Sequence, residues 1–237
     1  AGAATGATLK EEYLFNHYWM GRRQIERGMR AEGGPFAYVL DPNASHDRSS
    51  VVEFMDLMSQ SGIEFLLADE GFRAGGQDFP AGSYVIPPQA FRPYVVDLME
   101  PKQFPDRRQY PGGPPIPPYD MTGYELRFQM GLEVVNVAEP FDMPRGEWGV
   151  VSSAIGAMKG AGSAGYLLDG ASNWVYRGLG EYLAQGGDLF RGTRTISTPE
   201  GDVAAGAFWL PGLSEQAAGR EGAIGNRVAL PLGIRSV

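Results

Sequence analysis

The richest cluster of chemically capable side chains in the sequence lies between residues 41 and 48. Histidine, carboxylate, amide and guanidinium groups follow one another there, at Asp41, Asn43, His46 and Arg48. A histidine beside carboxylates can act as a general base or hold a metal ion. The same residue types also close turns and cap helices, here with Ser45 or Asp47 as the cap. The sequence favours turns and a cap over a ligand site.

The groups that hydrolysis requires are scarce in the rest of the chain. There is no cysteine, and the two histidines are His17 and His46. A thiolate nucleophile and cysteine-ligated zinc are therefore excluded. The Gly-rich run 156–162 lacks the Gly-Lys-Ser/Thr order of a phosphate loop and is predicted to be linker. We expect a protein that is not an enzyme and uses no cofactor or metal.

Charge and hydropathy limit the partners. The 28 acidic and 20 basic side chains give a net charge of −8, which disfavours broad binding to nucleic acid. No run of about 20 apolar residues predicts a transmembrane segment, which leaves only peripheral contact with a membrane. The start, Ala-Gly-Ala-Ala, is typical of cleavage at small residues, so we expect an exported, periplasmic or extracellular protein. Its expected partners are other protein chains of a larger complex.

Two stretches of the sequence repeat one another. Each runs from an apolar strand through a helical pattern to a closing Ala-Gly segment, first over 38–87 and then over 166–211. Gly62 is aligned with Gly187 in this comparison. Strand, helix and strand in succession predict a βαβ unit with parallel strands. The expected fold class is therefore α/β, with two related Rossmann-like or flavodoxin-like βαβ units, an N-terminal helix and long Pro/Gly-rich straps.

Composition predicts the order of the parts along the chain. A tail and amphipathic helix (1–34) precede the first α/β unit with its Pro-rich strap (35–138), a linker (139–163), the second repeat unit (164–212) and a C-terminal tail (213–237).

The N-terminal helix is predicted over Thr8 to Met29, with Thr8 and Glu11 as a capping box. Leu14, Tyr18 and Ile25 recur at helical spacing, and further aromatic residues lie off this stripe. The helix either packs on its own domain or docks on a partner or membrane surface. The candidate docking residues are Phe15, Tyr18, Trp19, Arg22 and Arg23.

Several motifs resemble a known family. They are Phe15–Tyr18, Gly21–Gly28, Phe79–Pro87, Tyr110–Pro114 and Pro118–Tyr124. Together they resemble the downstream, non-peptidase region of large secreted bacterial zinc carboxypeptidase-like proteins of carboxypeptidase A type. The resemblance covers roughly Tyr13 to Pro211 and implies a class I glutamine amidotransferase-like α/β fold.

The resemblance does not extend to catalytic residues. The family's zinc site resembles a His-x-x-Glu pair with a later His, and neither His17 nor His46 begins such a pair. We therefore expect a non-catalytic protein-binding or structural subunit that docks on a larger assembly, which could be membrane-associated. The alternative is an accessory domain or fragment of a secreted zinc carboxypeptidase whose catalytic domain lies outside this chain.

Overall fold

The computed structural model describes residues 8–89, 91–101, 105–117, 123–152, 165–168, 170–198, 201–211 and 232–233. The Gly-rich run 156–162 lies outside these residues. Contacts divide the chain into two compact units. Ala1–Leu40, Met58–Met130 and Val134–Gly149 form the first, and Asp41–Leu57, Gly131–Glu133 and Val150–Val237 form the second. Each unit therefore combines three separate segments of the chain, whereas the sequence predicted parts that follow one another.

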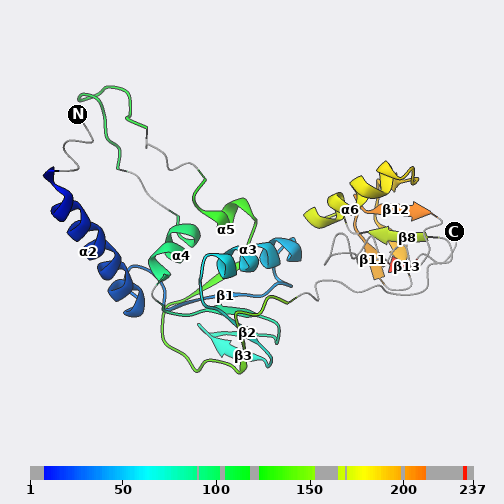
Figure 1. The fold of residues 1–237 in the computed structure, drawn as a ribbon. Coiled ribbons are helices and arrows are strands. Elements are labelled where there is room, and N and C mark those ends of the chain that lie inside the picture. The colour runs from blue at the N-terminus through cyan, green and yellow to red at the C-terminus, as the bar shows by residue number, and fades with distance from the viewer. Residues whose placement is uncertain are drawn as a thin grey trace. The chain divides into compact units, whose positions relative to one another are not determined.

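A five-stranded sheet forms the centre of the first unit (Figure 1). It contains β1 (Ala37–Leu40), β2 (Leu66–Ala68), β5 (Tyr84–Ile86), β6 (Val134–Val137) and β7 (Gly146–Trp148), in the order β6-β1-β5-β2-β7. Each neighbouring pair is antiparallel. All four residues of β1 are buried, as its continuous apolar run predicts.

The predicted pairing of parallel neighbours is wrong. The strands β1 and β2 run in the same direction, but β5 lies between them and is antiparallel to both. Between β2 and β5 the chain forms a hairpin and a turn closed by Ser83 N to Pro80 O, after which β5 runs back antiparallel beside β2. The α/β class stands in its general sense, while the adjacent parallel strands of a Rossmann-like or flavodoxin-like unit are not formed by the described strands.

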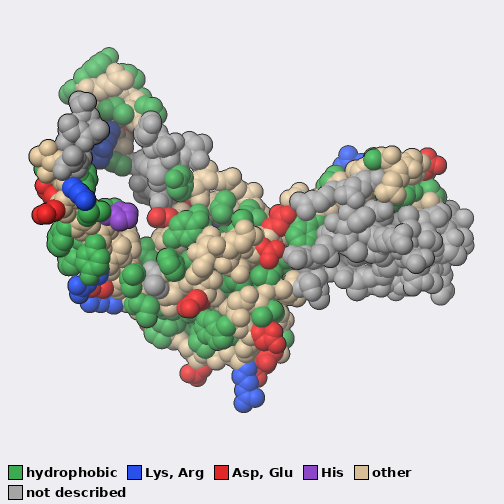
Figure 2. Space-filling view, viewed as in Figure 1, with side chains coloured by type: hydrophobic (Ala, Val, Ile, Leu, Met, Phe, Trp, Pro, Cys, Tyr) green, Lys and Arg blue, Asp and Glu red, His purple; other side chains and the backbone are tan. Residues whose placement is uncertain are grey.

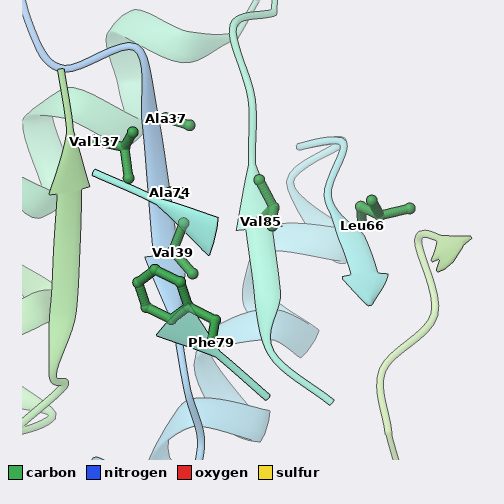
Figure 3. Packing of buried hydrophobic residues seen from close by; sticks show 7 residues of the cluster. All are labelled: Ala37, Val39, Leu66, Ala74, Phe79, Val85 and Val137. Carbon is green, nitrogen blue, oxygen red and sulfur yellow. The ribbon is translucent and has the colours of Figure 1, made fainter. Parts of the chain in front are cut away.

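The hairpin packs on one face of this sheet. Its strands are β3 (Phe72–Ala74) and β4 (Gln77–Phe79), joined by the predicted turn, where Gly75 and Gly76 have φ of +55° and +79°. Two successive positive φ values are the requirement of a type I′ turn, which glycine meets without strain. Figure 3 shows Phe79 beside Val39 of β1, within a cluster that also includes Val85 and Val137.

One described helix of the first unit precedes β1 in the chain, and two follow β5. They are α2 (Lys10–Met29), α4 (Arg92–Met99) and the short α5 (Leu126–Gln129), and α2 contacts α4. The predicted capping box is not formed. The helix begins one residue later than predicted, with Leu9 at the N-cap and no side-chain cap hydrogen bond. The Pro-rich strap bends back on itself through a bridge between Arg108 and Pro115.

The second unit contains a four-stranded sheet with the order β13-β8-β12-β9. Its elements are β8 (Gly165–Leu168), α6 (Asn173–Ala184), β9 (Phe190–Arg191), β10 (Ile196–Thr198), β11 (Gly201–Val203), β12 (Phe208–Pro211) and β13 (Leu232–Gly233). Helix α6 covers one face of the sheet through Val175 and Leu179. The β10–β11 hairpin covers Leu167 with Val203. Most of α3 (Arg48–Gln60) also belongs to this unit.

The two repeats have the same topology and the same strand register. In both, the order along the chain is strand, helix, strand, hairpin and a last strand inserted between the first two. Tyr38 pairs with Ile86 in the first repeat, and Tyr166 pairs with Leu210 in the second. The hairpins agree as well, since Phe72 faces Phe79 and Ile196 faces Val203.

The structure corrects the alignment of the two repeats by one residue. Gly62 corresponds to Gly186, not to Gly187, because both end a helix with positive φ, +73° and +83°. Their amides bond to equivalent carbonyls, Ser59 at 3.1 Å and Leu183 at 3.0 Å. Equivalent residues are 124 apart from here to the last strand but 128 apart in the first strand. The first repeat therefore has four more residues than the second between the first strand and the glycine that ends the helix.

Two strands arise where the sequence predicted none. Strand β7 lies in the predicted linker and pairs with β2, and β13 lies in the predicted tail and pairs with β8. Both are edge strands of three residues or fewer, too short for a period-2 pattern to be recognised. Residues 153–164 and 212–231 are outside the described part of the chain.

Candidate functional site

The first candidate residues, Asp41 and Asn43, form a turn. The Asp41 carboxylate accepts hydrogen bonds from the Asn43 backbone amide at 2.9 Å and from its side-chain amide at 3.0 Å. An Asp side chain that bonds the backbone two residues later is the ordinary Asx turn. This geometry fits the turn interpretation of the loop.

Asp47 caps two helices at once. Its Oδ1 accepts hydrogen bonds from the backbone amide and the hydroxyl of Ser49, at 2.9 and 2.6 Å, at the start of α3. Its Oδ2 accepts a hydrogen bond from the Asn173 amide at 2.9 Å, at the start of α6. All three residues belong to the second unit. The carboxylate thus satisfies free amides of both helix N-termini, where negative charge is also favoured by the helix dipoles.

Two serines and an indole extend this network. The hydroxyls of Ser49 and Ser172 lie 3.2 Å apart, and Ser172 Oγ accepts from the Trp174 amide at 3.3 Å. The Trp174 indole donates to Glu53. Ser49 is fully buried, and Asp47 and Ser172 are less than a tenth exposed. The polar groups of this network bond one another, and its chemistry is the mutual capping of α3 and α6.

The remaining residues of the predicted ligand cluster are not gathered into one site. His46 is exposed, and Arg48 is half-buried with Nε lacking a hydrogen-bond partner among the described residues. Within those residues no group of three or more His, Cys, Asp or Glu side chains is arranged to hold a metal. Of the four candidates, Asp41 and Asn43 are joined by hydrogen bonds in the described part of the chain.

The second candidate surface is helix α2. Gly28 is the buried residue of this 20-residue helix. Its large apolar side chains are 41 to 63 % exposed, and Figure 2 shows hydrophobic and basic side chains intermingled over it. These side chains are Tyr13, Leu14, Phe15, Tyr18, Trp19, Met20, Ile25 and Met29. We call this surface the α2 face.

Three aromatic residues of the α2 face, together with Arg22, form a ladder along the helix. The Phe15 and Trp19 rings stack with centroids 6.5 Å apart, and the Arg22 guanidinium lies 5.7 Å from the Trp19 ring. Arg22 also donates to Glu26 at 2.9 Å. The hydrogen bond to Glu26 raises the pKa of Arg22 above its already high ordinary value, and the Tyr18 hydroxyl adds to the effect. The ladder holds flat aromatic and guanidinium surfaces in fixed positions without covering them.

Of the predicted docking residues, the structure brings four together. Phe15, Tyr18, Trp19 and Arg22 take part in the ladder, whereas Arg23 is exposed and follows Arg22 around the helix. The C-terminal part of the helix and its C-cap carry Arg22, Arg23, Arg27 and Arg30, of which Arg22 pairs with Glu26 and Arg30 with Glu32. This end of the α2 face is therefore positive in a chain whose net charge is −8.

A shallow groove lies in the first unit, at a place that the sequence did not indicate. It is lined by Gly62, Ile63, Glu64, Trp148 and Gly149, between the start of β2 and the edge strand β7. Gln89 fixes one wall by two hydrogen bonds to the Glu64 backbone, at 2.6 and 2.7 Å. Trp148 is 57 % exposed at the opposite wall. The groove is mainly apolar, and no residue of the Asp41 loop lines it.

Sequence reasoning missed the long-range members of the polar network. The sequence predicted Ser45 or Asp47 as the cap of α3, and the structure shows that it is Asp47, but the bond of Asp47 to Asn173 spans 126 residues and leaves no local signal. The contact of Trp174 with Glu53 was missed for the same reason. The repeat gave a partial signal for this network, because the equivalent strands β1 and β8 precede α3 and α6.

Among the described helices, none has the length and apolar character needed to cross a membrane. No family model, curated protein or solved structure matches the chain.

Proposed function

We propose that the chain is a non-catalytic, protein-binding subunit that docks its α2 face into an apolar groove with an acidic rim on a partner protein. One observation carries the proposal. A helix of 20 residues buries a single glycine while its aromatic and aliphatic side chains remain about half exposed. Helices in proteins gain most of their stability from packing an apolar face, so such a helix is marginal by itself.

The energetics favour docking of one side of the helix. Leu14, Phe15, Tyr18, Trp19, Ile25 and Met29 fall on one broad side at helical spacing. Burying the exposed half of each such side chain stabilises by about 1 kcal/mol, or about 6 kcal/mol together. Association costs about 4–15 kcal/mol in lost freedom and ordering. The free energy gained by apolar burial is thus similar to the cost of association, and the charges on this helix decide which partner binds.

The charge pattern defines the partner's chemistry. The C-terminal part of α2 is positive, with Arg23, Arg27 and Arg30 exposed beside the Arg22–Glu26 pair. Guanidinium groups bind carboxylates with two parallel hydrogen bonds, which fixes orientation as well as adding affinity. A groove rimmed by Asp and Glu is the matching surface, in the mode by which amphipathic helices enter apolar grooves.

The test is native purification of the full chain from its producing cells, followed by hydrogen exchange of the complex. We expect a stoichiometric partner, protected amides across α2 in the complex, and weaker binding at high salt. The double variant Tyr18→Ala, Trp19→Ala should reduce recovery of the partner about tenfold or more. The matched control Tyr110→Ala removes an aromatic ring that is 61 % exposed elsewhere and should leave recovery unchanged. A monomer at every salt concentration, with unprotected α2 amides, contradicts the proposal.

The resemblance to secreted zinc carboxypeptidase-like proteins supports a second proposal. Here the chain is an accessory domain of such a protein, exported with it, and presents substrate to a zinc site outside this sequence. The motifs of α2 and of the strands, Gly21–Gly28 and Phe79–Pro87, favour it. Determining the complete reading frame tests it: an upstream domain with a His-x-x-Glu motif supports the accessory role, and a stand-alone frame contradicts it.

A further inference from the structure

The two repeats differ at one sheet edge. In the first repeat the outer edge of β2 is covered by β7, with Leu66 opposite Trp148, Leu67 opposite Glu147 and Ala68 opposite Gly146. Two further backbone bonds extend this ladder. Gly149 N donates to Phe65 O at 2.9 Å, and Asp69 N donates to Arg145 O at 3.0 Å. The outer edge of β2 is therefore a working strand-binding site within this molecule.

The equivalent edge in the second repeat belongs to β9. Phe190 and Arg191 correspond to Leu66 and Leu67, because they pair with Trp209 and Phe208 as those residues pair with Val85 and Tyr84. Gly192 bonds inward, donating to Ala207 O at 2.8 Å as Ala68 donates to Ser83 O at 2.9 Å. The backbone groups of Leu189, Arg191 and Thr193 consequently face outward. Among the described residues no strand pairs with this edge.

Side-chain exposure marks the same difference. Leu66, beneath β7, is 2 % exposed, whereas its counterpart Phe190 is 54 % exposed. The Phe190 ring lies 5.5 Å from the Trp209 ring, so two aromatic side chains lie together beside the outer backbone edge of β9. An edge strand with free amides and an exposed aromatic side chain is a template for a further strand.

We infer that the outer edge of β9 binds an extended segment of a partner protein as an added antiparallel strand, in the place that β7 holds on β2. This surface is separate from the α2 face and does not depend on it. The backbone bonds would supply affinity, and alternate side chains would supply selection, as in other cases of strand addition.

The residues at this edge define the sequence of the bound strand. A Cβ at Gly146 of β7 would collide with the Leu67 carbonyl oxygen, so a glycine is required at the corresponding position of the added strand. Arg191 is the counterpart of Leu67, which lies opposite Glu147 of β7. An acidic residue opposite Arg191 in the added strand would form an opposite-charge cross-strand pair. Phe190 stands where Leu66 faces Trp148, which favours an aromatic residue. The partner segment thus has the order glycine, acidic residue, aromatic residue.

The probe is a fluorescent peptide with the sequence of residues 144–150, Pro-Arg-Gly-Glu-Trp-Gly-Val, titrated with the full chain and followed by anisotropy. We expect saturable binding. The variant Arg191→Pro removes an amide that faces away from β12, a position where edge strands tolerate proline, and should weaken binding about tenfold or more. The variant Arg191→Ala keeps this amide and should weaken binding by about threefold, through the lost charge pair alone.

Two measurements keep the test independent of folding. Thermal unfolding of Arg191→Pro should match that of the wild-type chain. A peptide that is N-methylated at the position of Gly149 lacks the amide equivalent to the Gly149 N donor and should bind about tenfold more weakly to the unaltered protein. Absence of binding by the wild-type chain, or equal binding of the methylated and unmethylated peptides, overturns the inference. Equal binding by a folded Arg191→Pro variant overturns it as well.

Discussion

The two repeats share their framework but differ where strand leads into helix and at the outer sheet edge. The first repeat has three more residues between its first strand and its helix, and this longer loop contains Asp41, Asn43 and His46. It also ends in Asp47, whose carboxylate caps α3 and α6 together. The added loop therefore supplies a capping carboxylate for its own helix and for the helix of the other repeat. In a duplicated fold, such loop differences are where the copies acquire separate roles.

The interiors of the repeats differ in side-chain size. Phe54 of α3 is fully buried, and the corresponding position in α6 is Gly178. The outer strand β7 covers Leu66 in the first repeat, whereas Phe190 stays half exposed in the second. The second repeat thus has a smaller residue at this helix position and a more exposed outer edge at β9, which is the expected condition of a surface that binds other chains.

The largest expected effect concerns the last strand of each repeat. Ile86 and Leu210 occupy equivalent positions and are each 1 % exposed. Replacing either by Ala leaves a cavity and should lower the free energy of unfolding by about 2–5 kcal/mol. Denaturant unfolding followed by circular dichroism measures this. Leu183→Ala, at a residue that is 49 % exposed, is the control and should have little effect. A cost below about 1 kcal/mol in only one repeat would show that the two last strands are not equivalent.

A smaller effect is expected from Asp47→Ala, which tests whether the longer loop serves both repeats. Loss of the carboxylate leaves the amides of Ser49 and Asn173 without their acceptor and should cost about 1–3 kcal/mol. Hydrogen exchange should become faster at both amides. Ser172→Ala removes the acceptor for Trp174 N and the hydroxyl beside Ser49 Oγ, but it leaves the amides of Ser49 and Asn173 bonded to Asp47, so exchange at these two amides should stay close to that of the wild-type chain. Faster exchange in α3 with α6 unchanged would exclude the double cap.

The smallest effect concerns the turn before the last strand. Gly82 and Gly206 have φ of +87° and +101°, and their amides donate to the carbonyls of Ala68 and Gly192, each at 2.8 Å. Alanine at either position is strained in this conformation and should cost about 1 kcal/mol, by nearly the same amount in both repeats. Gly21→Ala in α2 is the opposite control, because alanine favours a helix interior and no atom lies within 4 Å of the new methyl group. Thermal melts of the three variants compare them. A destabilising effect at one turn only would contradict the shared geometry.

Local patterns predicted the elements better than their arrangement. The apolar run at β1, the helical spacing of α3 and the Gly75-Gly76 turn are each set by neighbouring residues, and each is present. In α3 the pattern left the buried residue open between Leu57 and Met58, and the structure buries Met58. The order of the strands in the sheet depends on long-range pairing, which strand patterns of three or four residues do not encode.

The alignment of the repeats contained a signal that was overlooked. Gly62 and Gly82 lie 20 residues apart, as do Gly186 and Gly206, and this spacing identifies Gly186 as the equivalent glycine. For the candidate site, the Asx turn at Asp41 and the cap at Asp47 follow from local chemistry. The exposure of the α2 face does not, because an amphipathic pattern is the same whether the helix packs on its own domain or on another protein.

The inserted last strand has a consequence for biosynthesis. As the chain leaves the ribosome, β1 and β2 emerge first, yet neither has a neighbouring strand to pair with until β5 follows. The second repeat must wait in the same way for β12, and β8 gains its other neighbour only with β13 near residue 232. Nascent strands with unpaired edges thus persist over long stretches of translation, and these are the species that chaperones recognise.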